Sequence, residues 1–211
     1  MHDGTDSPDG QAPQAAIVFK DACVKRGGRV IWRHGSFSIP SGSVTAIVGT
    51  NGAGKTTMMK AELGLIDTTA GSITVLGKPA GVMNQHIGYV PQSYAVDIES
   101  NLTAEQSVLL GLTGTRFGIH PVTRAQREKA RKAMEFVGLL DKASYRLSEL
   151  SGGLRQRAAI AQALVSDPQL LMLDEPLANL DLASQRATVH VLAKLNRELG
   201  MTIQVVAHDM Y

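Results

Sequence analysis

The sequence contains few residues of several types, and each shortage excludes a class of protein. Cys23 is the one cysteine in 211 residues, so no disulfide can form within the chain and a reducing compartment is expected. Aromatic residues make up 4% of the chain, which predicts a mainly aliphatic core with Cys23 as a small buried member. No apolar run approaches the roughly 20 residues that span a bilayer. We therefore expect a cytoplasmic protein with one sizeable core, to which a subdomain can be added.

Charge of one sign is also lacking, because 21 Lys and Arg residues stand against 19 Asp and Glu residues, for a net charge of +2. This balance argues against a nucleic-acid partner and against a polybasic membrane patch. The N-terminus lacks the basic and apolar regions of a signal peptide. Residues 1–13 are rich in Gly, Asp, Ser, Pro and Gln, and we expect them to be a disordered lead-in. Any membrane role would then need a separate membrane partner.

The clearest motif runs from 49 to 57 and matches the pattern G-x-x-x-x-G-K-[ST] of phosphate-binding loops. A buried strand at 44–48 and a helix from 57 favour this interpretation over a chance glycine-rich turn. Glycines let backbone N–H groups and the helix N-terminus approach a phosphate. We expect Lys55 to neutralise the β- and γ-phosphates and the Thr56 hydroxyl to bind Mg²⁺. The predicted nucleotide-binding residues are Gly49, Thr50, Asn51, Gly52, Ala53, Gly54, Lys55, Thr56 and Thr57.

The rest of the chain indicates an α/β fold. Spacing becomes helical from 102 to about 150, which predicts a small helical subdomain inserted between strands, and its cations are better explained by a solvated helix face than by nucleic-acid binding. The predicted strands cover 15–24, 36–39, 44–48, 71–77, 87–90, 170–173 and 202–207. The predicted helices cover 57–65, 103–112, 123–137, 154–165 and 183–199. The fully apolar run at 170–173 suits a parallel strand covered on both faces.

Two adjacent carboxylates, Asp174 and Glu175, follow that apolar strand directly, at the end where open α/β sheets bind ligands. We expect Asp174 to hold Mg²⁺, directly or through water, and Glu175 to polarise the water that attacks the γ-phosphate. Acidic residues after a strand also favour the N-terminus of a following helix. The phosphate-binding loop upstream makes the catalytic interpretation the stronger one.

Two polar residues stand just past other predicted strands. His208 ends the last strand, where a neutral imidazole would hydrogen-bond the γ-phosphate or its attacking water. Gln92 follows the strand at 87–90, where its amide oxygen would reach Mg²⁺ or water. A lone His is more often structural, and a lone Gln in a loop carries little information, so both assignments depend on the other motifs.

A second anion site is predicted where Ser151, Gly152 and Gly153 precede the helix at 154–165. It is unusual for one small domain to have two helix N-termini that are each suited to bind a phosphate group. Their simplest use is a dimer in which each subunit offers one site to each nucleotide. A simple helix cap is the alternative, and the two roles are compatible.

Taken in order, these motifs resemble the nucleotide-binding subunit of an ATP-binding-cassette (ABC) transporter. They correspond to Walker A at 49–56, the Q-loop at Gln92, the signature at 150–153, Walker B at Asp174 and Glu175, the D-loop at Leu180 and Asp181, and the switch histidine at His208. The resemblance implies one ABC ATP-binding domain over 14–211 with a helical subdomain at about 102–165. It also implies a P-loop NTPase fold, with a mostly parallel sheet core, N-terminal antiparallel strands and an inserted helical subdomain.

The resemblance further implies partners. A head-to-tail homodimer would hold two ATP molecules between Walker A of one subunit and Ser151 and Gly153 of the other, closing on ATP binding and opening on hydrolysis. That motion would pass to integral membrane permease subunits docked near Gln92, with the chain on the cytoplasmic face of the membrane. The segments 87–92 and 174–181 are similar to the branch that imports zinc or manganese with an extracytoplasmic metal-binding receptor. The six histidines are scattered, so we expect no transported metal on this chain.

Three features depart from the family pattern. Leu154 stands where the signature usually continues with Gln, and its apolar side chain is expected to weaken dimer closure. Arg26 stands where an aromatic residue usually stacks on adenine, and its guanidinium plane would stack on the base instead. The chain stops at Tyr211, three residues past His208, where the family normally continues, so a truncated product is expected.

The leading hypothesis is an ATPase that binds ATP and Mg²⁺ and powers a membrane transporter. A second is a non-transport cassette ATPase, although such proteins usually carry long coiled-coil insertions or two cassettes in one chain, and neither is present. A third is a nucleotide-binding module with weak turnover, which Leu154, Arg26 and the end at Tyr211 favour. A small-molecule kinase or GTPase is least favoured, because no Asn-Lys-x-Asp motif is present.

Overall fold

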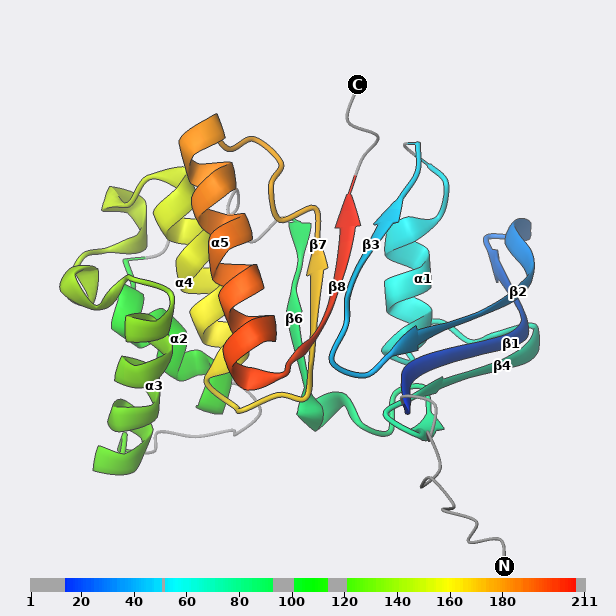
Figure 1. Ribbon diagram of the computed structural model, residues 1–211, viewed down its shortest axis with the longest axis horizontal. Coiled ribbons are helices and arrows are strands. Elements are labelled where there is room, and N and C mark those ends of the chain that lie inside the picture. Colours follow the sequence, from blue (N-terminus) through cyan, green and yellow to red (C-terminus); the bar gives the residue numbers. More distant parts are fainter. Residues whose placement is uncertain (1–13, 51, 93–100, 114–120, 208–211) are drawn as a thin grey trace, which may run out of the picture.

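A computed structural model of the protein describes residues 14–50, 52–92, 101–113 and 121–207. Two sheets organise these ranges, an antiparallel sheet of order β2-β1-β4-β5 and a parallel sheet of order β3-β8-β7-β6 (Figure 1). The antiparallel strands are β1 (Ala15–Arg26), β2 (Arg29–Pro40), β4 (Ala70–Val75) and β5 (Lys78–Pro79). The parallel strands are β3 (Val44–Val48), β6 (Ile87–Val90), β7 (Leu170–Asp174) and β8 (Thr202–Ala207).

The first hairpin is longer than the sequence predicts, because β2 begins at Arg29 and not near Ser36. Gly27 and Gly28 form its two-residue turn with φ of 55° and 76°, a conformation that glycine adopts without steric cost. Arg26 and Arg29 close the turn as a register pair. Turn geometry therefore extends the strand pairing through a basic stretch that the hydrophobic pattern alone assigns to a turn.

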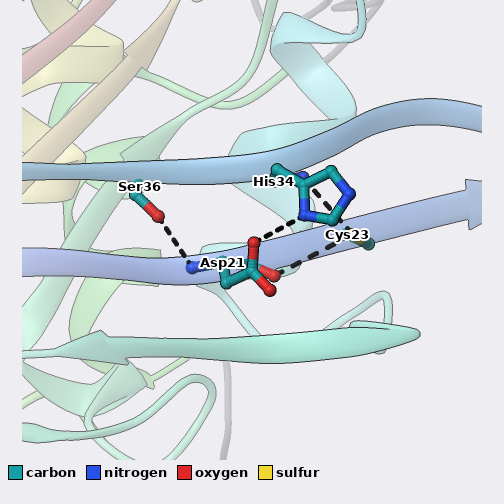
Figure 2. A network of polar contacts seen from close by, with 4 residues as sticks. All are labelled: Asp21, Cys23, His34 and Ser36. Atoms are coloured by element: carbon teal, nitrogen blue, oxygen red, sulfur yellow. Dashed lines mark hydrogen bonds and ion pairs between the residues drawn. The ribbon is translucent and has the colours of Figure 1, made fainter.

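The hairpin is irregular near the middle of β1, where the register with β2 shifts. Asp21 and His34 both have positive φ, of 48° and 54°. Polar contacts hold this bulge together: the Asp21 N–H donates to Ser36 Oγ at 2.9 Å, and His34 Nδ1 lies 2.6 Å from Asp21 Oδ1 (Figure 2). The His34 N–H donates to Cys23 Sγ at 3.3 Å. Cys23 is therefore half-buried within this network and is not the core residue that the sequence predicts.

Each face of the parallel sheet packs against its own apolar cluster, because alternate residues of a strand point in opposite directions. Leu171 and Leu173 of β7 belong to the cluster with α4 (Gly152–Leu164) and α5 (Leu182–Leu199). Leu170 and Met172 belong to the cluster with α1 (Lys55–Glu62) and the antiparallel sheet. Figure 1 shows α4 and α5 on one side of the sheet and α1 on the other. Every residue of β7 is buried, as the sequence predicts.

A helical region covers the sheet beside α4. The helices α2 (Ala104–Thr113) and α3 (Arg124–Phe136) pack against α4, and a capping box between Thr123 and Gln126 starts α3. Short 3₁₀ helices are η1 (Asn84–His86), η3 (Leu140–Lys142) and η4 (Leu147–Glu149). The cations of α3 are exposed, as predicted for a solvated face: Arg124, Arg127, Lys129, Arg131 and Lys132.

The predicted α/β class, with antiparallel strands at the N-terminal side and a helical part, is confirmed. The boundaries of the helical subdomain at about 102–165 and of the domain at 14–211 stay predictions. Over the described ranges, none of the helices combines the length and the apolar character needed to cross a membrane.

The carboxyl ends of the four parallel strands lie at one edge of their sheet, since all their pairings are parallel. This edge is uppermost in Figure 1, and α1, α4 and α5 all begin on the same side. Most of the predicted site residues follow these strands or stand at the first turns of these helices. The topology thus gathers them at one edge, where open α/β sheets bind ligands.

Candidate nucleotide-binding site

The loop between β3 and α1 has the backbone geometry that the phosphate-binding motif predicts. Gly52 and Gly54 have φ of 81° and 86°, a left-handed backbone conformation that residues with a side chain rarely adopt. Gly54 is the N-cap of α1, and a Cβ atom there would lie only 2.3 Å from Ile31 Cγ2. Because α1 begins at Lys55, the N–H groups of its first turn, which lack intrahelical partners, are available to an anion at this loop.

Lys55 holds its ammonium group inside this loop. The side chain is buried, and Nζ donates to the carbonyl oxygens of Gly49 and Thr50, the latter at 3.0 Å. Over the described ranges, no carboxylate lies within ion-pair distance of Lys55 Nζ. A buried cation whose hydrogen bonds go to neutral carbonyl groups favours the approach of an anion, because burial of a charge without an ion-pair partner is costly.

Asp174, at the end of β7, is joined to the loop through Thr56, whose hydroxyl donates a hydrogen bond to the carboxylate. Burial raises the pKa of Asp174, the hydrogen bond from Thr56 lowers it, and the neighbouring Glu175 raises it again. Asp174 Oδ1 is buried and has no hydrogen-bond partner among the described residues. An orphaned carboxylate oxygen beside a hydroxyl suits Mg²⁺, which takes few protein ligands together with phosphate oxygens and water. The residues present therefore fit this metal.

Glu175 and Gln92 meet at the same edge, although 83 residues separate them. Gln92 Nε2 donates to Glu175 Oε2 at 2.5 Å, and the Glu175 N–H donates to the Val206 carbonyl of β8 at 2.9 Å. Glu175 has a φ of 53°, and such strain costs about 1–3 kcal/mol and is concentrated at functional sites. Gln92 makes this contact through its amide nitrogen, so a role for its oxygen on Mg²⁺ stays a prediction.

Ser151 is exposed at the start of α4, where its Oγ accepts a hydrogen bond from the Leu154 N–H at 3.4 Å. Gly153 is buried against α5, and a Cβ atom there would lie 2.4 Å from Ser184 Oγ. Ser184 is itself bonded to Asp181, the N-cap of α5, through its N–H at 2.9 Å and its hydroxyl at 2.8 Å. Gly153 thus allows the starts of α4 and α5 to approach closely, a role that the sequence does not signal.

We expect Gly153→Ala to displace the start of α5 and Gly152→Ala to be tolerated, because the nearest atom to a Cβ at Gly152 is Leu180 Cδ2 at 3.4 Å. Overpacking at Gly153 should lower the free energy of unfolding by about 1–3 kcal/mol. Thermal unfolding of the two variants checks this difference. Equal unfolding midpoints would contradict the assigned packing role.

Trp32, the chain's one tryptophan, packs against the loop, although its sequence pattern gives no signal of this contact. Its Cδ1 and Nε1 would lie 3.2 Å and 3.6 Å from a Cβ atom at Gly54. Nε1 is buried and has no hydrogen-bond partner over the described ranges. The indole therefore contacts the backbone that is predicted to hold the nucleotide.

We expect Mg-ATP to change the fluorescence of Trp32, because a ligand that rearranges the loop at Gly54 alters the surroundings of the indole. A titration of tryptophan emission with Mg-ATP measures the change. Trp32→Phe should abolish the signal while calorimetry still detects ATP. Constant emission at a saturating ATP concentration would contradict the contact.

Three predicted site residues are not described fully. Asn51 and His208 lie outside the described residues, and of Arg26 only the backbone is described, at the end of β1. Their roles stay predictions. Lys55, Thr56, Asp174, Glu175 and Gln92 are brought together, whereas Ser151, Gly152 and Gly153 start a separate helix.

Known proteins are similar in sequence to most of this chain. The family model described as "ABC transporter" matches residues 33–178. A Chlamydia muridarum protein named "Probable metal transport system ATP-binding protein" is 38% identical over 195 residues, which are 92% of this chain and 75% of the relative. The zinc transport system ATP-binding protein TroB of Treponema pallidum is 40% identical, over 82% of this chain and 64% of TroB. The manganese transport system ATP-binding protein MntB of Bacillus subtilis is 38% identical, over 83% of this chain and 70% of MntB.

Solved structures of ABC transporter ATP-binding domains also resemble this chain. CbiO1 from Clostridium perfringens, part of the ABC transporter complex cbiONQ, is 27% identical with a TM-score of 0.82, over 92% of this chain and 79% of that one. The ATP-binding cassette MJ0796, in a dimeric post-hydrolysis state bound to ADP and Pi, is 28% identical with a TM-score of 0.75. The match covers 92% of this chain and 88% of MJ0796. The P-loop NTPase fold is thereby confirmed. The chain belongs to the ABC transporter family, as a subunit that binds and hydrolyses ATP.

Proposed function

We propose that ATP binds on the loop at 49–57 with Mg²⁺ and that Glu175 is the general base for its hydrolysis. One observation carries this proposal: three separate segments, which contain Thr56, Gln92 and the pair Asp174 and Glu175, are joined by hydrogen bonds and contacts at one sheet edge. Lys55 lies in the adjoining loop. When bound by Thr56, Asp174 and Gln92, Mg²⁺ would neutralise charge on the phosphate oxygens.

Each side chain has a distinct task in this proposal. Lys55 transfers its hydrogen bonds from the carbonyls of Gly49 and Thr50 to phosphate oxygens. Glu175 accepts a proton from the attacking water, and Gln92 orients the carboxylate through its amide nitrogen. His208 binds the γ-phosphate or the water, and Arg26 stacks on the base.

The second nucleotide contact comes from another copy of the chain. Ser151, Gly152 and Gly153 present the N-terminus of α4 to ATP held on the partner's phosphate-binding loop, which makes a head-to-tail homodimer. The exposure of Ser151 and the dimeric state of the related cassette MJ0796 support this arrangement. Leu154 is partly buried against the helical cluster, so its effect on closure comes through packing.

The dimer acts on integral membrane permease subunits at the cytoplasmic face of the membrane, together with an extracytoplasmic substrate-binding protein. The substrate is a zinc or manganese ion, and this ion does not contact the chain. The names of the related TroB and MntB proteins support the metal, as do the segments 87–92 and 174–181. Over the described ranges, no group of three or more His, Cys, Asp and Glu side chains is placed to hold a metal ion.

Uptake into vesicles tests this transport function. The chain is reconstituted with a candidate permease and metal-binding receptor, and ATP-dependent uptake of zinc, manganese and an oxyanion is compared. We expect metal uptake that Glu175→Gln abolishes. Uptake of the oxyanion alone would exclude the metal assignment, and ATP hydrolysis that no membrane partner changes would favour a non-transport cassette.

A further inference from the structure

Glu62 and Gln204 form a buried polar contact between α1 and the parallel sheet. Both side chains are 0% exposed. The apolar cluster on this face includes Met59 and Ala61 of α1 and Met172 of β7, which is the register partner of Gln204. Gln204 Nε2 donates to Glu62 Oε1 at 3.0 Å, across 142 residues of sequence.

The hydrogen bonds of this pair are incomplete if Glu62 is ionised. Glu62 Oε2 and Gln204 Oε1 are both buried and have no partner over the described ranges. In the carboxylate form both atoms are acceptors, so neither can bond the other. In the neutral form Glu62 Oε2 carries a hydroxyl and is a donor, so it complements the unpaired acceptor Gln204 Oε1.

The surrounding charges do not favour the carboxylate form. In the parallel sheet the titratable residues are Asp174 of β7 and Tyr89 of β6, whereas β3 and β8 have none, and neither has β4 of the antiparallel sheet. The charges that act on Asp174 are those of Glu175, Lys60 and Lys55, whereas the pKa of Glu62 is shifted by burial and by Gln204. Burial raises the pKa of Glu62 to about 8, against a smaller lowering by the hydrogen bond from Gln204.

We propose that Glu62 is a neutral carboxylic acid that forms a reciprocal pair of hydrogen bonds with Gln204, and that this pair positions the phosphate-binding loop. Glu62 is the last residue of α1, and the first, Lys55, lies in the loop. Gln204 stands two residues before Val206, whose carbonyl binds the backbone of Glu175. The pair therefore fixes the helix that begins at the nucleotide against the strand that holds the proposed base. Glu62 acts as a positioning residue and not as a catalytic one.

Infrared difference spectra between the parent chain and Glu62→Gln test the protonation state directly. A neutral carboxyl group and a carboxylate absorb in separate bands, and we expect the neutral band at pH 7. Carboxylate bands alone at pH 7 would overturn the proposal. In Gln204→Leu the neutral band should move to higher frequency, because its hydrogen bonds are lost. A band that does not move would refute the pairing.

The pH dependence of ATP affinity tests the positioning role, and this part rests on the proposed nucleotide site. Glu62→Gln can make both hydrogen bonds and cannot titrate, so it mimics the neutral acid. Between pH 7 and pH 9 we expect the dissociation constant for Mg-ATP to rise at least fivefold more in the parent than in Glu62→Gln. The exposed control Glu128→Gln should keep the parent profile.

The outcomes separate the two proposals. Identical pH profiles in the parent and Glu62→Gln would overturn the positioning role. A chain that shows the neutral band but binds no ATP would instead contradict the proposed nucleotide site.

Unfolding supplies an independent check that needs no nucleotide. Because burial raises the pKa of Glu62 from its ordinary value of 4.5 to about 8, the native chain keeps a proton that the unfolded chain releases. The resulting stabilisation is present below pH 4.5, falls as the pH rises towards 8, and is constant above it. The unfolding constant should therefore rise up to tenfold per pH unit in this window, relative to Glu62→Gln. Parallel curves for the two chains would contradict a neutral Glu62.

Discussion

Glu175→Gln is expected to slow ATP hydrolysis by about 10²–10⁴-fold, the contribution that a positioned general base usually makes. An amide has nearly the same shape as the carboxylate but cannot accept the proton of the attacking water. Its oxygen can still accept the hydrogen bond from Gln92, so the edge formed by β6, β7 and β8 should keep its geometry. ATP affinity should stay within a fewfold of the parent, because Lys55 and the loop at 49–57 are untouched.

Phosphate release measures the rate of hydrolysis, and size exclusion with and without Mg-ATP measures whether the variant binds ATP and dimerises. Slow hydrolysis traps bound ATP, so we expect the variant to shift to a dimer that the parent shows only transiently. Glu128→Gln, the same substitution on the exposed face of α3, is the control and should hydrolyse ATP at the parent rate. Full turnover by Glu175→Gln would show that another group is the base. A monomer that binds ATP without shifting would instead point to an effect of Leu154 on dimer closure.

Lys55→Ala should remove measurable ATP binding. The ammonium group is buried inside the loop, where it meets the carbonyls of Gly49 and Thr50. Loss of one partner of a buried charged contact costs about 2–5 kcal/mol, or roughly 30-fold or more in affinity. Calorimetry with Mg-ATP measures the loss, and the fluorescence of Trp32 gives a second readout.

Lys60→Ala is the matched control for this substitution, because Lys60 is on the same helix and only half-buried. Its charge acts on Asp174 from a distance, so its removal should change ATP affinity by no more than a fewfold. Circular dichroism confirms that both variants keep their helices. Parent-level ATP affinity in Lys55→Ala would remove this residue from the proposed site.

The parts of the site that the sequence predicts are those encoded by neighbouring residues. The glycines and Lys55 of the loop stand within a few residues of one another, between a β-branched strand and a helix, and the structure keeps that order. The apolar run of β7 likewise predicted a strand buried on both faces. The predicted start of β2 is wrong, because a hydrophobic pattern does not show how far the Gly27-Gly28 turn extends strand pairing.

Contacts between distant residues came only from the tertiary structure. Gln92 and Glu175 were each predicted from their own segment, but their hydrogen bond depends on the order in which β6 and β7 pair. The approach of Gly153 to Ser184 and of Trp32 to Gly54 has no signature in either segment.

Glu62 shows the limit of the sequence most clearly. A glutamate in a helix is normally a solvated residue. It is buried here because the helix packs its last turn on β8, opposite the one polar amide of that strand.

The sequence by itself determined which nucleotide chemistry this protein carries, because turns, strand patterns and phosphate-binding loops are set by local backbone preferences. The tertiary structure alone decided which side chains meet and which protons they hold, because burial and hydrogen-bond partners depend on how distant elements pack.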